Sequence, residues 1–152
     1  NHYIDDMYID DAALQGDCRV NTLVPTGAGN YTQWDTTASA GNYAAIDEIP
    51  YSASDYNSTS TLNEIDSFDM TTFSGGDILA IQVNTVADKS DAGMRAIVDF
   101  CRSNSVDYTG DTYYLSTDEQ IFTKVRAVDP NTSAAWASAA LNAAEFGYKL
   151  TV

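Results

Sequence analysis

The chain has 152 residues with 22 acidic and only 7 basic side chains, which gives a formal net charge of −15. This charge argues against nucleic acid and against a membrane surface as partners, because binding phosphate groups needs Lys and Arg. The length predicts one domain with its own core, and the abundance of Thr, Ser, Asn, Asp and Tyr over Lys and Glu favours strands and turns over helices. We therefore expect a single all-β domain over residues 1–152. Because the sequence does not begin with Met, we also expect this domain to be the C-terminal part of a longer chain.

The first half of the chain alternates predicted strands with long loops. Pro25 is expected to end a strand, since proline cannot donate to a sheet ladder. Clusters of Gly, Asn, Ser and Thr mark the loops. The predicted strands are residues 2–11, 18–24, 42–49 and 61–70, and the predicted loops are residues 26–41 and 50–60.

Alternation of apolar and polar side chains is clearest in residues 76–102. Every second position from residue 79 to 87 is apolar except Thr85, and apolar residues again take every second position from residue 94 to 100, with turn-forming residues 89–93 between the two runs. A period of two indicates strands with one buried and one wet face. We predict a β-hairpin here, to which the other strands are added.

The last third of the chain is predicted as a turn at residues 104–110 followed by strands at 112–115, 121–127 and 146–152. Residues 133–144 have helical composition, and we expect at most a short helical turn there, capped by Ser133. About eight strands without βαβ alternation favour an antiparallel two-sheet β-sandwich of jelly-roll type.

Catalytic residues are hard to identify in this chain. The only histidine is His2, and a base at a chain end is poorly placed for a hydrolase triad. Asp47 and Glu48 are the best carboxylate pair for glycoside hydrolysis, but acids at strand ends are usually solvated. We expect no catalytic residue, no cofactor and no enzymatic activity.

Calcium is the inorganic partner for which the chain offers candidate ligands, although the D-x-[DN]-x-[DN]-G loop pattern is absent. The candidates are the acids Asp5, Asp6, Asp10, Asp11 and Asp17. Cys18 and Cys101 have no second ligand at C-x-x-C spacing. Two buried thiols are favoured over one disulfide bridge, and both alternatives stay open.

Aromatic residues in the predicted loops are candidates for binding a ligand or a neighbouring protein. Tyrosine and tryptophan rings fill protein interfaces and also stack on sugars, and we favour the interface. A carbohydrate-binding, lectin-like module for host recognition is the alternative. The candidate residues are Tyr31, Trp34, Tyr51 and Tyr56.

Several strings occur in a familiar order: IDDMYIDD, GDCRVNTLVPTGAGNYTQW, NYAAIDEIP, GDILAIQVNTVADKSDAGMR and W-x-x-x-x-L-N-A-A-E-F-G-Y-K-L. Together they resemble a domain of tailed-bacteriophage virion proteins that often follows a concanavalin A-like jelly-roll domain. The resemblance covers nearly the whole chain. It implies a structural protein on the virion surface, of capsid decoration, head-fibre or tail-fibre type. The implied partners are other virion proteins and further copies of the chain, with three copies in a fibre. Host surface glycans are the expected partners under the lectin-like alternative.

Overall fold

The computed structural model describes residues 18–152. The predicted strand at residues 2–11, His2 and all five candidate calcium ligands lie outside the described residues. The strands are β1 (Pro25–Thr32), β2 (Asp35–Thr36), β3 (Asn57–Ser58), β4 (Ile65–Met70), β5 (Ile81–Ala87), β6 (Ala96–Ser103), β7 (Val106–Tyr114), β8 (Gln120–Arg126) and β9 (Glu145–Leu150), and the helices are the 3-10 helix η1 (Asn42–Ala45) and the short α-helix α1 (Ser138–Asn142).

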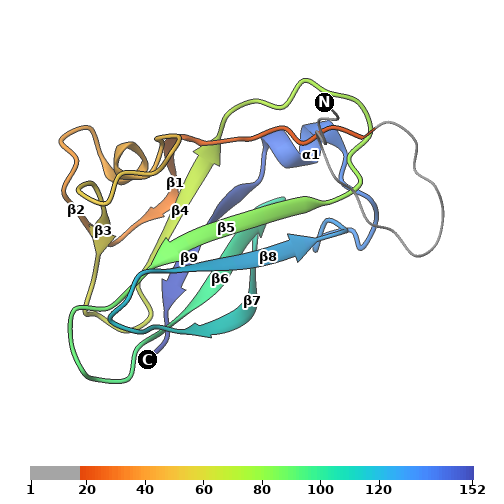
Figure 1. The fold of residues 1–152 in the computed structure, drawn as a ribbon. Coiled ribbons are helices and arrows are strands. Elements are labelled where there is room, and N and C mark those ends of the chain that lie inside the picture. The colour runs from red at the N-terminus through yellow and green to blue at the C-terminus, as the bar shows by residue number, and fades with distance from the viewer. Residues whose placement is uncertain (1–17) are drawn as a thin grey trace, which may run out of the picture.

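The strands form an antiparallel, two-layer β-sandwich, which confirms the predicted fold class. One layer is a five-stranded sheet in the order β1-β4-β9-β6-β7, and the other is the two-stranded pair β5-β8. Figure 1 shows this pair lying across one face of the larger sheet, with the small β2-β3 pair at one end. The second layer is therefore much narrower than the first.

The prediction of a hairpin between β5 and β6 is wrong, although both strands exist. β5 pairs with β8, while β6 lies between β7 and β9 in the larger sheet. Both faces of β6 are buried from Ala96 to Cys101, whereas β5 is only half-buried. A strand buried on both faces takes a central position with two partners, so residues 88–95 cross between the layers instead of closing a hairpin.

The N-terminal third differs most from the predictions. Residues 18–24 form no strand, and β1 begins at Pro25, where a strand was expected to end. Proline is tolerated as the first residue of an edge strand because no ladder bond is lost there. The predicted loop at 26–41 contains β1, whose Gly29 comes so close to β4 that a Cβ atom would lie 2.8 Å from the backbone carbon of Ser67. Residues 42–49, predicted as a strand, begin with η1.

The C-terminal third follows the predictions more closely. The turn expected at residues 104–110 is limited to Asn104 and Ser105, which have φ angles of 50° and 64°, and β7 continues from there. The helical turn is present as α1, but its N-cap is Ala137. Ser133, the predicted cap, lies instead in the preceding turn with a φ of 57°.

The main core lies between the two layers. Its buried residues come from β6, β9 and the segment around α1, and they are Cys101, Trp136, Leu141, Ala144 and Phe146. Partly buried apolar side chains pack against them from β4, β5, α1 and the connecting segments, namely Leu23, Met70, Phe73, Ile78, Ile81, Val83 and Ala140.

Candidate interaction surface

The aromatic residues singled out in the sequence do not come together. Tyr31 meets Phe100 edge-on, with ring centroids 5.6 Å apart, and Trp34 packs on Tyr148 at 4.6 Å. Phe100 pairs with Gly147, the neighbour of Tyr148 in β9. Because successive strand residues point to opposite faces, Tyr31 and Trp34 lie on opposite faces of the larger sheet.

The other two candidates, Tyr51 and Tyr56, are 49% and 53% exposed. The Tyr51 hydroxyl donates a hydrogen bond to the carboxylate of Glu119. The indole N–H of Trp34 already donates to the carbonyl of Glu64, at 3.2 Å. Within the described part of the chain, these four side chains form no common platform on which a sugar ring could stack.

Tyr31 belongs to a polar cluster that no local sequence pattern predicts. Its hydroxyl donates to Asp107 at 2.6 Å, and this hydrogen bond is the main cause that raises the pKa of Tyr31. The guanidinium of Arg102 also donates to Asp107. Glu145 accepts from the Ser67 hydroxyl at 2.6 Å. These groups satisfy one another across β1, β4, β6, β7 and β9, so the cluster holds the edge strand β1 against the sheet.

A second polar cluster surrounds the buried carboxylate of Asp66. It accepts hydrogen bonds from the amides of Gln33 at 2.7 Å and Trp34 at 3.0 Å and from the Asn42 side chain at 2.6 Å. Burial raises the pKa of Asp66, and these three hydrogen bonds oppose the rise. These hydrogen bonds hold the segment between β1 and η1 against β4. The role of the cluster is therefore to stabilise the fold.

The candidate catalytic pair, Asp47 and Glu48, lies in the half-buried segment after η1. One carboxylate oxygen of Glu48 is buried without a hydrogen-bond partner among the described residues.

Residues 18–152 contain no group of three His, Cys, Asp or Glu side chains arranged to hold a metal ion. Both cysteines are free thiols, and Cys101 is buried in the core.

A pocket of about 210 Å³ lies beside α1, where Ser103 and Asp129 meet. The buried carboxylate of Asp129 accepts hydrogen bonds from the Ser103 hydroxyl at 2.7 Å, the Asn131 amide at 3.0 Å and the Thr132 hydroxyl at 3.2 Å. These bonds fix the turn after β8. The carboxylate therefore organises the local backbone and is not free to act on a ligand.

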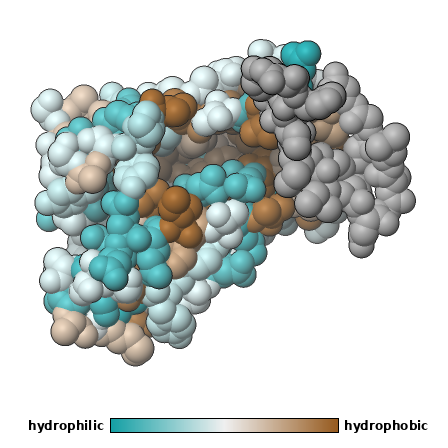
Figure 2. All heavy atoms as spheres, viewed as in Figure 1, coloured by the Kyte–Doolittle hydropathy of each residue, from teal (hydrophilic) through white to brown (hydrophobic). Residues whose placement is uncertain are grey.

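The outer side of the β5-β8 pair is the surface best suited to contact another protein. Alternate residues of both strands point outward there, and we call this surface the ribbon face: Gln82, Asn84, Val86, Ile121, Thr123 and Val125. Ile121 is 67% exposed and Val125 is 56% exposed. Figure 2 shows hydrophobic and hydrophilic residues side by side over these strands. The ribbon face carries no charged residue.

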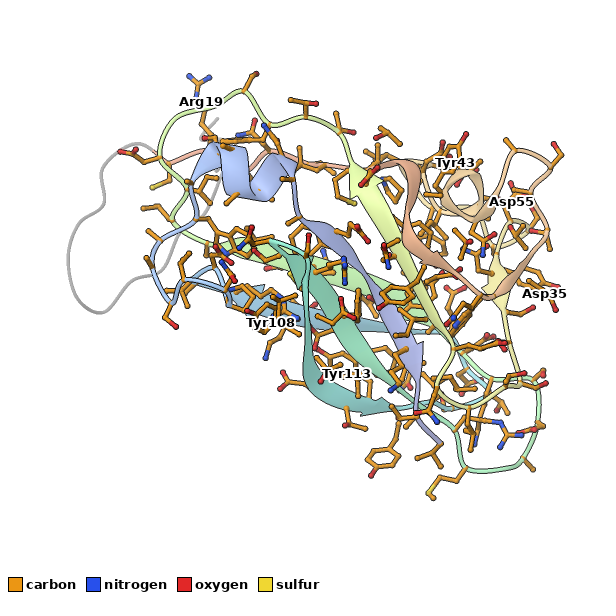
Figure 3. The ribbon with its side chains drawn as sticks, turned by 180° about the vertical axis from the view of Figure 1, so that it is seen from behind. Arg19, Asp35, Tyr43, Asp55, Tyr108 and Tyr113 are labelled. Atoms are coloured by element: carbon orange, nitrogen blue, oxygen red, sulfur yellow. The ribbon has the colours of Figure 1, made fainter. Side chains whose placement is uncertain are left out.

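The ribbon is held to the larger sheet through β7. Figure 3 shows Tyr108 and Tyr113 on this strand. The ring of Tyr113 stacks on Phe122 of β8 at a centroid distance of 4.8 Å, and its hydroxyl donates to the carbonyl of Thr123 at 3.3 Å. The strand pair that carries the ribbon face is thus held in place by contacts between its inner side and β7.

Comparison of the chain with known proteins does not indicate a function for the ribbon face. No family model, curated protein or solved structure matches the chain. Among residues 18–152, no helix has the length and apolar character needed to cross a lipid bilayer.

Proposed function

We propose that this chain is a non-enzymatic structural protein of a tailed-bacteriophage virion, located on the particle surface as a capsid decoration, head-fibre or tail-fibre protein. The observation that carries the proposal is the uncharged ribbon face of a chain with a net charge of −15. The order of strings described above supports the viral setting.

The composition of the ribbon face suits attachment to a protein neighbour. The centres of protein interfaces are depleted of charged residues and surrounded by a polar rim. Scattered exposed apolar side chains are ordinary on a protein surface, but here Ile121 and Val125 share one face of the ribbon with Val86. Burying them against a neighbour removes apolar surface from water without desolvating a charge.

The proposed assembly contains several copies of the chain, with three copies if it forms a fibre. Copies that each carry a charge of −15 repel one another at most orientations. A charge-free surface such as the ribbon face is where this repulsion is least, so we place contacts with virion neighbours or further copies there.

Co-sedimentation of the purified chain with virus particles that lack it tests the proposal. The wild-type chain is expected to sediment with the particles in stoichiometric amounts, and Ile121→Glu, which puts a charge into the ribbon face, is expected to remain in the supernatant. Leu62→Glu is the matched control, because Leu62 is 55% exposed but lies outside this face. Wild-type chain that stays in the supernatant, or Ile121→Glu that sediments like the wild type, would contradict the proposal.

A further inference from the structure

One edge of β5 has no backbone partner among the described residues. The other edge pairs with β8 over seven consecutive residue pairs, from Ile81 to Ala87, without a register shift. Residues 18–152 contain no further backbone hydrogen bond to these seven residues. In an antiparallel strand every second residue directs its N–H and C=O groups to the same side. A regular row of donors and acceptors therefore faces outward from β5.

This edge has none of the features that usually protect an edge strand from pairing with another chain. Such features are charged residues, proline and bulges. The sequence of β5 is IQVNTVA, which contains no charged residue, proline or glycine. The edges of the larger sheet are different, because β1 begins with Pro25 and its ladder has register shifts, and the β6-β7 ladder is also shifted. The open edge of β5 is thus a specific feature of the ribbon.

A groove lies next to this edge. Figure 2 shows the surface hollowed between the ribbon and the segment that leads into β1 in Figure 1, with apolar atoms at its floor. The segments around it supply apolar side chains that are only partly buried, namely Leu23, Met70, Phe73, Ile78 and Val83. The groove has β5 on one side and the segment before β1 on the other, so a chain segment that enters it lies alongside the open edge of β5.

We propose that an extended segment of a neighbouring protein chain binds in this groove and adds to β5 as a third strand of the ribbon. Backbone hydrogen bonds to β5 supply the affinity, and apolar side chains at alternate positions of the added strand cover the groove floor. The segment is neutral or basic, because an acidic segment would be repelled by a chain with a charge of −15.

A second copy of the chain, paired edge to edge through β5, fits the observations less well. A contact between two seven-residue edges falls short of the roughly 1,200 Å² that stable interfaces bury, and it leaves the groove floor uncovered. Only the identification of the donor as a virion protein rests on the proposed function. Strand addition itself is a property of the β5 edge.

The probe for the test is a peptide of sequence QIFTKVR with blocked ends, which copies β8, the strand that pairs with β5. It is basic and forms a strand in its native context. Two further peptides carry backbone N-methyl groups. The first is methylated at all odd-numbered positions and the second at all even-numbered positions. N-methylation removes the backbone N–H donor, so only one of the two peptides retains the N–H groups that face β5.

Amide NMR spectra of the full chain, titrated with each peptide, give the readout. The unmodified peptide and one methylated peptide are expected to produce saturable shifts in β5, with hydrogen exchange of alternate β5 amides slowed by about tenfold or more. The other methylated peptide is expected to have no effect. Absence of saturable shifts with the unmodified peptide, or equal binding by both methylated peptides, would overturn the proposal.

Two variants of β5 locate the binding site. Thr85→Lys places a charge on the inner side of the edge strand, and Asn84→Lys places the same charge on the ribbon face. The first is expected to weaken peptide binding by about tenfold or more and the second to leave it unchanged. Equal effects would contradict an added strand. Because particle co-sedimentation depends on Ile121 and not on this edge, strand addition and the proposed function can fail separately.

Discussion

The guanidinium of Arg126 in β8 donates to the carboxylate of Asp99 in β6, and this ion pair joins the two layers of the sandwich. The side chains are only 8% and 3% exposed. The other carboxylate oxygen of Asp99 accepts the amide of Asp111 at 2.7 Å. The pair therefore sets how the ribbon sits on the larger sheet, and with it the position of the ribbon face and of the β5 edge.

Removing one partner of this pair is expected to be costly. Arg126→Met should lower the free energy of unfolding by about 3–5 kcal/mol, because the carboxylate of Asp99 stays buried without its counter-charge. Adding Asp99→Asn should recover most of the loss, since the amide oxygen still accepts from Asp111. Urea unfolding of both variants measures this. A loss within about 1 kcal/mol for Arg126→Met, as for an exposed pair, would show that the pair is not buried in solution.

Gly147 in β9 is required by close packing. A Cβ atom at this position would collide with the backbone carbonyl oxygen of Asp66 in β4, and a backbone atom cannot move aside cheaply. We expect Gly147→Ala to destabilise the fold by about 3 kcal/mol or more. Gly76→Ala, where a Cβ atom meets nothing within 4 Å, should change stability by about 0.5 kcal/mol at most. Equal thermal unfolding temperatures of the two variants would contradict this packing.

The buried thiol of Cys101 makes stability depend on pH in the alkaline range. Burial raises its pKa from 9.0 to about 11. The unfolded chain therefore loses the thiol proton at lower pH than the folded chain, so this contribution is complete below pH 9 and declines as pH rises towards 11. Urea unfolding at pH 8 and pH 10.5 is expected to show a smaller decline for Cys101→Ala than for the wild type. An identical decline in the two proteins would contradict the assignment.

Trp34 is expected to act through packing and not through sugar binding. Trp34→Ala removes the contact with Tyr148 and the hydrogen bond to Glu64, and should cost about 2 kcal/mol or more. Tyr56→Ala, at an exposed site, should cost about 0.5 kcal/mol or less. A glycan array run with both variants is the second measurement. A sugar bound by the wild type and lost in Trp34→Ala but not in Tyr56→Ala would contradict the structural role.

The sequence predicted the strands of the ribbon and of the sheet centre but not their partners. Alternation of apolar residues shows that β5 and β6 are strands, because the period reports on each strand separately. It does not report which strand lies beside which. Alternation places Asp99 on the face of β6 that is expected to be exposed to solvent. In the structure this face is buried too, because Asp99 forms an ion pair with Arg126 of the other layer. A local pattern predicts that a charged strand residue such as Asp99 is exposed, because it does not show the counter-charge, which lies 27 residues later in the sequence.

The N-terminal third escaped prediction for a different reason. β1 contains Gly27, Gly29 and Asn30, which are turn-forming residues in most contexts. Here the glycines allow β1 to lie close to β4, and this packing outweighs their low strand propensity. For the candidate site, composition pointed to aromatic loops, while the ribbon face and the β5 edge depend on strand pairing. That information lies in tertiary contacts and not in any local pattern.

A cryo-EM map of purified virus particles, combined with quantification of the chain per particle by mass spectrometry, tests the central proposal most directly. We expect the β-sandwich at regularly repeating surface sites, in a copy number set by the particle symmetry, with the ribbon face against a neighbouring protein. Particles that contain the chain in trace amounts, or that lack its density at every surface site, would contradict a structural role in the virion.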